Sequence, residues 1–213
     1  MNDLIKDCVG CGLCAIECPK HAISMHSNEE GFLYPEIDEQ TCDGCDICNL
    51  VCKGYKKQCH QKNKAPKVKA CQTLDERWLI ESTAGGFFPT LAQWVIEQNG
   101  VVFGTAYSTN MIPVVCKAES IEEVYRFNGS KYVQSDLSLA LPEVKAELEK
   151  GRIVLFSGTP CQVAAVKTLC KEFVGKSLLT MDVVCYGVPS PGLFRAFLDL
   201  SLIHISEPTR LRR

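Results

Sequence analysis

The sequence predicts a small cysteine-rich α+β domain followed by a larger α/β domain with a largely parallel sheet. Two observations lead to this prediction. Eight of the 14 cysteines fall into two runs of identical spacing near the N-terminus. From about residue 81 onward, short apolar segments alternate with helical patterns and glycine turns, which is typical of an α/β domain.

Each cysteine run has the spacing Cys-x2-Cys-x2-Cys-x3-Cys. The first run is Cys8, Cys11, Cys14 and Cys18, and the second is Cys42, Cys45, Cys48 and Cys52. Bacterial ferredoxins with two [4Fe–4S] clusters have this ligand spacing, and in them the last cysteine of each run ligates the other cluster. The sequence therefore assigns one cluster to Cys8, Cys11, Cys14 and Cys52. It assigns the second cluster to Cys42, Cys45, Cys48 and Cys18.

Disulfide bonds and zinc binding are the alternative uses of these cysteines. The chain opens without a signal peptide, which favours a reducing compartment and argues against disulfides. Zinc knuckles usually use separate Cys-x2-Cys pairs instead of this repeated run. We therefore expect a ferredoxin-like module over residues 1–60. Its shared clusters would replace the large hydrophobic core that so short a segment cannot build.

Composition points to a cytoplasmic protein with one small and one medium-sized domain. The chain has 213 residues, a formal net charge of −2 and 46% hydrophobic residues. We expect no membrane span, because no apolar run is long enough to cross a bilayer. The near-neutral charge offers no electrostatic basis for a nucleic-acid partner.

Start and stop signals mark the helices of the larger domain, which follows a basic, polar linker predicted over residues 61–80. A glycine follows the first and third helices, a Ser-x2-Glu capping box opens the second, and a proline stands in the first turn of the third. The expected helices are Phe87–Gln98, Ile121–Arg126 and one that includes Pro142 and ends at Lys150.

Four apolar segments read as strands of the same domain. They are Val101–Gly104, Val114–Cys116, Ile153–Ser157 and Leu178–Val184. Because helical patterns separate several of these strands, we expect a substantially parallel sheet. Ligands of such sheets bind at the carboxyl ends of the strands, so the segments that follow the strands are the candidate sites.

A glycine turn after the third strand leads into a helix that opens at Pro160. Free N–H groups at a helix start can hold a phosphate or stabilise a thiolate, which makes Gly158, Thr159 and Cys161 candidate site residues. A tight turn without a ligand is the alternative. Cys185 follows another strand, and spacing alone favours it as a small buried residue. Residues 129–136 suit cofactor recognition or, equally, a polar surface loop.

The chain resembles the coenzyme F420 hydrogenase/dehydrogenase beta-subunit family. The resemblance rests on the cysteine runs and on the motifs ESTAGGFF, NGVVFGTAY, FNGSKYVQSD, FSGTPCQVAAVKTL and DVVCYGVPSP. It implies an iron–sulfur flavoprotein that uses FAD to pass electrons between a hydride carrier, F420 or NAD(P)H, and the clusters. Matching motifs assign the flavin site to Thr83, Gly85, Gly86, Ser130, Lys131, Tyr132, Gly158 and Thr159, with Cys161 as the catalytic candidate.

The same resemblance implies further partners and cofactors. A further [4Fe–4S] cluster is expected in the full-length protein, with Cys161 and Cys185 as two of its ligands and the other two beyond the end of this chain. A redox partner protein is expected to exchange electrons with the chain. The alternative function is a non-catalytic electron-relay subunit that docks on a partner enzyme, in polysaccharide biosynthesis.

The motif resemblance stops at about Asp199. Residues 200–210 match the translation of a transposon sequencing adapter, so we expect the tail 200–213 not to be natural sequence. The predicted architecture is therefore an α+β ferredoxin-like two-[4Fe–4S] module, a linker, a truncated α/β flavin-binding domain (81–199) and this tail. We expect the truncated domain to expose an apolar sheet edge and the chain alone to be inactive.

Overall fold

The computed structural model describes residues 8–52 and 67–206, with side chains up to residue 201. The N-terminal domain contains helix α2 (Leu13–Ile16) and an antiparallel hairpin of β1 (Ile23–Ser27) and β2 (Leu33–Ile37). Residues 47–52 are also helical. Cysteines make up much of the interior of this domain, because Cys14, Cys18 and Cys48 pack together around Ala22 and Ile23. This composition agrees with the predicted ferredoxin-like α+β domain.

The second domain is a mixed α/β domain with a sheet of order β4-β3-β5-β6 among the described residues. β3 pairs in parallel with β5, and β5 with β6, whereas β3 and β4 form an antiparallel hairpin. The strands are β3 (Val101–Tyr107), β4 (Pro113–Ala118), β5 (Val154–Gly158) and β6 (Leu178–Asp182). The substantially parallel sheet is confirmed, and its one antiparallel pair follows from the short turn between β3 and β4.

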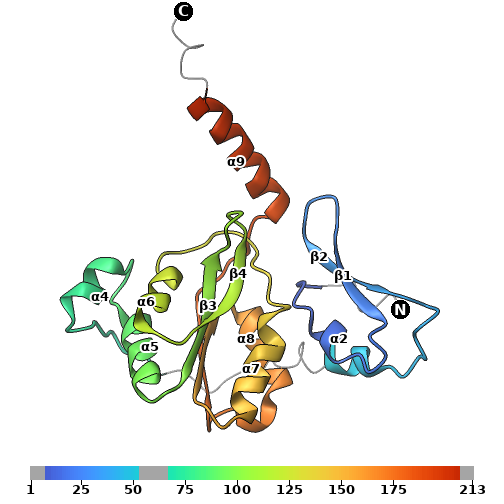
Figure 1. Ribbon diagram of the computed structural model, residues 1–213, viewed down its shortest axis with the longest axis horizontal. Coiled ribbons are helices and arrows are strands. Elements are labelled where there is room, and N and C mark those ends of the chain that lie inside the picture. Colours follow the sequence, from blue (N-terminus) through green and yellow to red (C-terminus); the bar gives the residue numbers. More distant parts are fainter. Residues whose placement is uncertain (1–7, 53–66, 207–213) are drawn as a thin grey trace, which may run out of the picture.

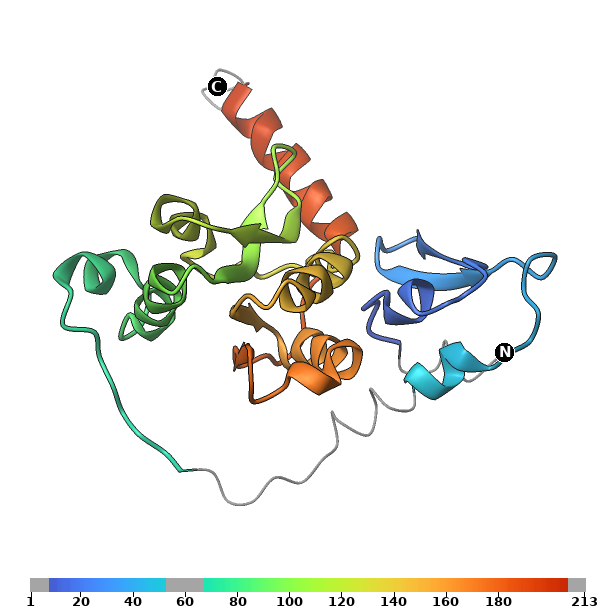
Figure 2. The same cartoon turned by 60° about the horizontal axis from the view of Figure 1, so that its bottom comes forward.

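Helices cover both faces of this sheet (Figures 1 and 2). On one face lies α5 and on the other lie α7 and α8, with the N-terminal domain beyond them. The helices of this domain are α4 (Glu76–Glu81), α5 (Phe87–Glu97), α6 (Ile121–Val124), α7 (Ala140–Glu149), α8 (Pro160–Leu169) and α9 (Pro191–Ser206), with 3₁₀ turns at Tyr125–Phe127 and Lys171–Phe173. Among the described helices none is both long and apolar enough to cross a membrane.

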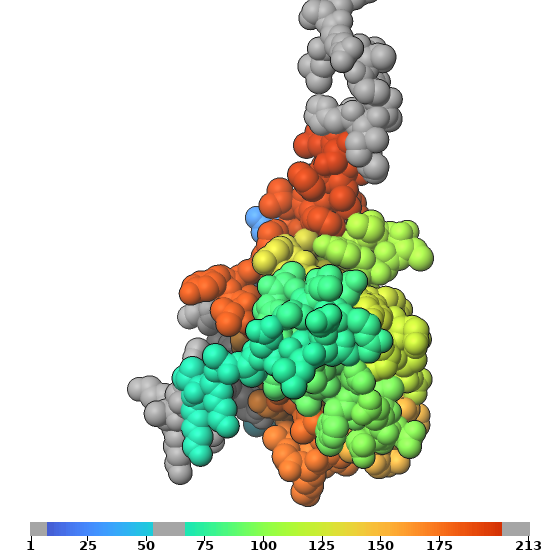
Figure 3. Space-filling model, turned by 90° about the vertical axis from the view of Figure 1, so that its left-hand side faces the viewer, coloured from blue at the N-terminus to red at the C-terminus, as the bar shows by residue number. Residues whose placement is uncertain are grey.

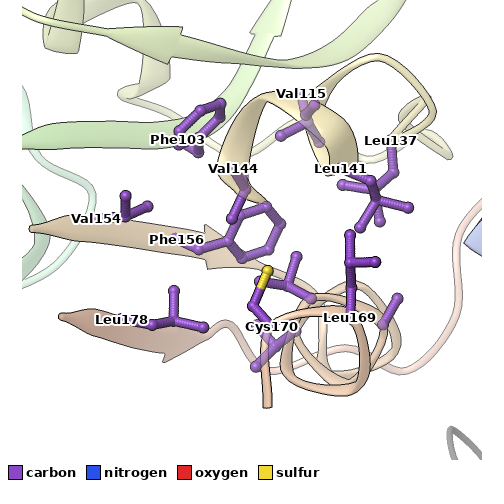
Figure 4. Close-up of a cluster of buried hydrophobic side chains, with 14 of the residues drawn as sticks. Phe103, Val115, Leu137, Leu141, Val144, Val154, Phe156, Leu169, Cys170 and Leu178 are labelled. Carbon is purple, nitrogen blue, oxygen red and sulfur yellow. The ribbon is translucent and has the colours of Figure 1, made fainter. Parts of the chain in front are cut away.

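The strands divide the hydrophobic core into two layers. Val101 and Phe103 of β3 join Phe156 of β5 in the layer beneath α7 and α8, which Figure 4 shows in close-up. Val102 and Leu155, one position along, belong to the layer beneath α5. This alternation follows from the two-residue period of a strand, and it explains why both central strands begin with an uninterrupted run of three apolar residues.

Two predicted boundaries are wrong. The predicted linker 61–80 contains the start of α4, where Trp78 is buried. The Trp78 ring lies against Tyr125 in a tilted arrangement with centroids 4.7 Å apart, and its Nε1 donates to Gln93 Oε1. These tertiary contacts outweigh the polar local sequence. The strand expected to reach Val184 ends at Asp182, and Val184 is 90% exposed.

Helix α9 is held at its start and projects from the body (Figures 1 and 3). Its first turn packs against both domains. Phe194 stacks on Tyr107 with ring centroids 6.1 Å apart. A Cβ atom at Gly31, in the β1–β2 turn, would lie 2.6 Å from the backbone nitrogen of Gly192, so these two backbones touch. The helix continues through residue 199, where we expected the natural sequence to end.

Glu147 is a buried carboxylate, 4% exposed, at the end of α7. It accepts hydrogen bonds from Lys150 Nζ at 2.9 Å and Arg152 Nη1 at 3.0 Å, and Lys117 Nζ lies 3.8 Å away. Burial acts to raise the pKa of Glu147, but the hydrogen bonds from Lys150 and Arg152 outweigh it, so the pKa lies below its usual range.

We expect Glu147→Gln to lower the free energy of unfolding by about 1–2 kcal/mol at neutral pH, because charge-assisted hydrogen bonds are lost and solvent screens part of their strength. The folded-state pKa is lowered, so the charged form stabilises the fold above the usual glutamate pKa. The difference from wild type should close as the pH falls through the lowered pKa. Urea titrations at several pH values measure this, with the exposed Glu149→Gln as control. Equal stabilities at neutral pH would contradict the prediction.

Candidate functional site

The first cysteine set lines one small cavity in the N-terminal domain. Cys8, Cys11, Cys14 and Cys52 surround it together with Met25 and Val51. Gly10 and Gly12 have the left-handed φ values of 66° and 73°, and they fold the loop so that the Gly10 N–H donates to Cys8 Sγ at 3.4 Å. The structure thus brings together the last cysteine of the second run with the first three of the first run, which is the grouping of the interleaved assignment. The ligation itself stays a prediction.

Burial disfavours the charged form of two of these thiols, Cys11 and Cys14. It raises the pKa of Cys11 to about 11 and that of Cys14 to about 12, and the charges of neighbouring cysteines add to the effect. Cluster ligands must be thiolates. Ligation at this site therefore requires release of protons to the solvent.

The second cysteine set is more open. Cys18 is buried beside Cys48 and accepts the Ala22 N–H at 3.4 Å, whereas Cys42 and Cys45 are exposed. Within residues 8–52 and 67–206, no three His, Cys, Asp or Glu side chains lie close enough to bind a single metal ion. A cubane cluster separates its four ligands more widely than a single ion does, because each thiolate binds a different iron.

A groove of about 1170 Å³ lies between the two domains. Its wall on the N-terminal domain includes Cys8, Cys11, Phe32 and Tyr34. All the predicted flavin residues line it: Thr83, Gly85, Gly86, Ser130, Lys131, Tyr132, Gly158 and Thr159. Cys161 and Cys185 line it as well. Residues from three separate motifs of the larger domain thus meet at one place, at the carboxyl end of β5 and β6.

Three side-chain atoms at this groove are buried without a hydrogen-bond partner in the described part of the chain. They are Ser82 Oγ, Asn128 Nδ2 and Gln134 Oε1, and all three residues line the groove. A buried polar atom without a partner costs about 1–3 kcal/mol. The groove is therefore suited to a ligand that offers both hydrogen-bond donors and acceptors.

The start of α8 differs from the expectation of free N–H groups. Thr159 and Gln162 form a reciprocal capping box, in which Gln162 Oε1 accepts the Thr159 N–H at 3.1 Å. Pro160 has no N–H to offer. Gln162 Nε2 also donates to Ser135 Oγ at 2.8 Å. Gln162 thus joins two walls of the groove, and this helix start is largely satisfied within the protein.

Lys131 is also engaged within its own loop. Its Nζ donates to the carbonyl oxygens of Arg126 at 2.9 Å and Asn128 at 2.8 Å, and burial lowers its pKa. It therefore shapes the loop over residues 126–131. Tyr132 beside it is 77% exposed at the groove.

Cys161 lies between the groove and the first cysteine set. Its Sγ is 3.0 Å from Thr159 Oγ1, and its charge contributes to the raised pKa of Cys11. Cys185 accepts the Gly187 N–H at 3.4 Å.

Ser82, Asn128 and Gln134 were not singled out from the sequence as candidate site residues. Each lies inside one of the motifs ESTAGGFF and FNGSKYVQSD. Its polar side chain is the only local sign of a role at the groove. Phe32 and Tyr34 had no signal at all, because they reach the groove only through docking of the two domains.

Comparison with known families gives a match within each domain. Residues 7–54 match the family described as 4Fe-4S dicluster domain. Residues 151–211 match the family that describes the C terminus of the coenzyme F420 hydrogenase/dehydrogenase beta subunit. The second match continues beyond Asp199, where we expected the resemblance to stop. The origin of residues 200–213 stays a prediction.

Individual relatives are similar over different parts of the chain. The F subunit of the F(420)H(2) dehydrogenase of Methanosarcina mazei is 24% identical over 190 residues, which are 84% of this chain and 53% of that protein. The VorC subunit of the ketoisovalerate oxidoreductase of Methanothermobacter marburgensis is 35% identical over 48 residues, 22% of this chain and 61% of that protein. This chain thus spans about half the length of the first relative.

One solved structure is the F420-reducing [NiFe] hydrogenase complex from Methanosarcina barkeri. It aligns with a TM-score of 0.49 and 18% identity, and the alignment covers 60% of this chain and 47% of that one.

The dicluster match and the paired cysteine runs define an iron–sulfur protein with a domain for two [4Fe–4S] clusters. More particularly, the match of residues 151–211 and the Methanosarcina mazei relative, taken with the dicluster domain, support the coenzyme F420 hydrogenase/dehydrogenase beta-subunit family. As the name of that family states, its members are subunits of oxidoreductases.

The interleaved ligation can be tested with two double variants of the anaerobically reconstituted chain. If Cys18 serves the second cluster, Cys18→Ser/Cys48→Ser should damage one cluster and keep about half of the iron. Cys18→Ser/Cys14→Ser should damage both clusters. Iron analysis and EPR spectra measure the outcome, with exposed Cys71→Ser as control. If each run instead binds its own cluster, the two double variants will exchange their results.

Proposed function

We propose that this chain is the electron-transferring part of a cytoplasmic iron–sulfur flavoprotein. It holds FAD in the groove between its domains and exchanges electrons between a hydride carrier, F420 or NAD(P)H, and two [4Fe–4S] clusters. One observation carries the proposal: the groove is lined both by all the predicted flavin residues and by Cys8 and Cys11.

The groove residues fit FAD by three criteria. Its volume of about 1170 Å³ suits a dinucleotide, since pockets for smaller ligands are about 300–1000 Å³. The buried Asn128 Nδ2 and Gln134 Oε1 offer a donor and an acceptor without partners in the described residues. Phe32, Phe87 and Phe88 give apolar surface for a ring system. FAD, when bound, takes two electrons together and releases them singly, whereas each cluster accepts one.

The positions of the cysteines support a direction for electron flow. Cys8 and Cys11 line the groove, and with Cys14 and Cys52 they form the buried set, so we assign this cluster the role of first acceptor. Cys42 and Cys45 are exposed, so we assign the second cluster the exchange with a redox partner protein. The chain holds the two sets in one small domain, which keeps the path short.

Cys161 has two proposed roles. Its position at the groove suits contact with the substrate or cofactor. Cys185 lines the same groove, so the two cysteines could each supply one ligand to a further [4Fe–4S] cluster. Thr159 Oγ1, 3.0 Å from Cys161 Sγ, can exchange a hydrogen bond with it in either role.

FAD binding tests the proposal directly. We expect the chain with reconstituted clusters to quench FAD fluorescence on binding, and Asn128→Leu to weaken binding about tenfold, because one hydrogen bond to a buried donor is lost. Asn110→Leu, an exposed turn residue outside the groove, is the matched control. A wild-type chain that carries its clusters, binds no FAD and is inert to F420H2 and NAD(P)H would point instead to a relay subunit.

A second experiment separates the roles of Cys161. We expect Cys161→Ser to slow reduction of the clusters by the hydride donor and to leave the iron content unchanged, as measured by stopped-flow absorbance and iron analysis. Cys170→Ser, a buried cysteine outside the groove, is the control. A loss of about four iron atoms per molecule when Cys161→Ser is made in the full-length protein would assign this residue to a further cluster.

A further inference from the structure

Gln134 connects three parts of the molecule. Its Nε2 donates to the carbonyl oxygen of Val9, between Cys8 and Gly10, at 3.2 Å. Its backbone N–H donates to the carbonyl oxygen of Pro189, in the loop after β6, at 3.2 Å. Its side chain also lines the groove.

The contact with the cysteine loop is close. A Cβ atom at Gly10 would lie 3.1 Å from Gln134 Nε2 and 2.8 Å from the carbonyl oxygen of Leu33. Gly10 also has a φ of 66°, which favours glycine. The loop that carries Cys8 and Cys11 is therefore fitted against the Gln134 carboxamide, with no space for a side chain between them.

The orientation of this carboxamide follows from its partner. Val9 offers a carbonyl oxygen, which can only accept, so the NH2 group of Gln134 must face it. Oε1 then points away from Val9, and it is buried without a partner among the described residues. Rotating the amide would satisfy neither atom, because two oxygens would then face each other.

We propose that Gln134 is a positioning residue that couples the groove to the first cluster. Its Oε1 accepts a hydrogen bond from an N–H or O–H group of the molecule in the groove, while its Nε2 holds the Val9 carbonyl. One rigid carboxamide thus ties the position of the bound molecule to the backbone between two cluster ligands. This inference rests on the proposed function, with FAD as the bound molecule.

The coupling has a measurable consequence. Hydrogen bonds and backbone placement around the sulfurs help to set the reduction potential of an iron–sulfur cluster. FAD binding should therefore shift the potential of the first cluster through Gln134. The second cluster, which does not touch Gln134, should keep its potential.

Two variants separate the two hydrogen bonds. Gln134→Leu removes both, so we expect about tenfold weaker FAD binding and loss of the FAD-dependent shift in potential. Gln134→Glu keeps an acceptor for the groove but cannot donate to Val9. We expect it to bind FAD more tightly than Gln134→Leu and still to lose the shift. The exposed Gln98→Leu is the control and should behave as wild type.

The measurements are FAD fluorescence titrations and EPR-monitored redox titrations of the reconstituted chain, with and without FAD. Iron content shows that each variant keeps its clusters. A wild-type chain that binds no FAD overturns the proposed function and this inference together. A wild type that binds FAD, with Gln134→Leu equal to it in affinity and in the FAD-dependent shift, overturns the inference alone.

Discussion

The burial of Leu13 is the contact on which the rest of the site depends. This residue lies between Cys11 and Cys14, yet it is 1% exposed and belongs to the main core of the second domain, with Leu137 and Leu141. An apolar side chain of the cysteine loop is thus buried in the neighbouring domain, at a gain of about 1.5–3 kcal/mol. The groove exists because this contact holds the loop against the sheet domain.

The two cysteine sets differ in their burial, because only the first set includes a cysteine that packs, like Leu13, against the core of the second domain. The cavity of the first set is lined by Leu13 of α2 and by Met25 and Pro35 of the hairpin. Cys11 packs against the core of the second domain, and burial raises the pKa of Cys11 and Cys14. In the second set, Cys42 and Cys45 are exposed to solvent. One domain thus offers an enclosed cluster site toward the groove and an accessible one toward the surface, without any change in ligand chemistry.

Local chemistry explains what could be predicted from the sequence. Cluster ligation requires a fixed cysteine spacing, and the apolar runs of the central strands β3 and β5 follow from burial on both faces, so both could be predicted. Helix α4 was missed because it depends on burial of Trp78 against Tyr125. The open helix start at Pro160 was wrong because Gln162 caps it. The motifs identified the groove segments, but the unpartnered atoms of Asn128 and Gln134 depend on how distant segments dock.

The contact between Gly31 and Gly192 has a consequence for how the sequence can vary. Surface hairpin turns usually tolerate longer side chains and insertions. Here the first atom of any side chain at Gly31 would strike the backbone at the start of α9. A turn that looks like a free surface loop therefore acts as a spacer between domains, and lengthening it would displace α9 and widen the groove. Variation of this turn is limited by the distance between the two domains.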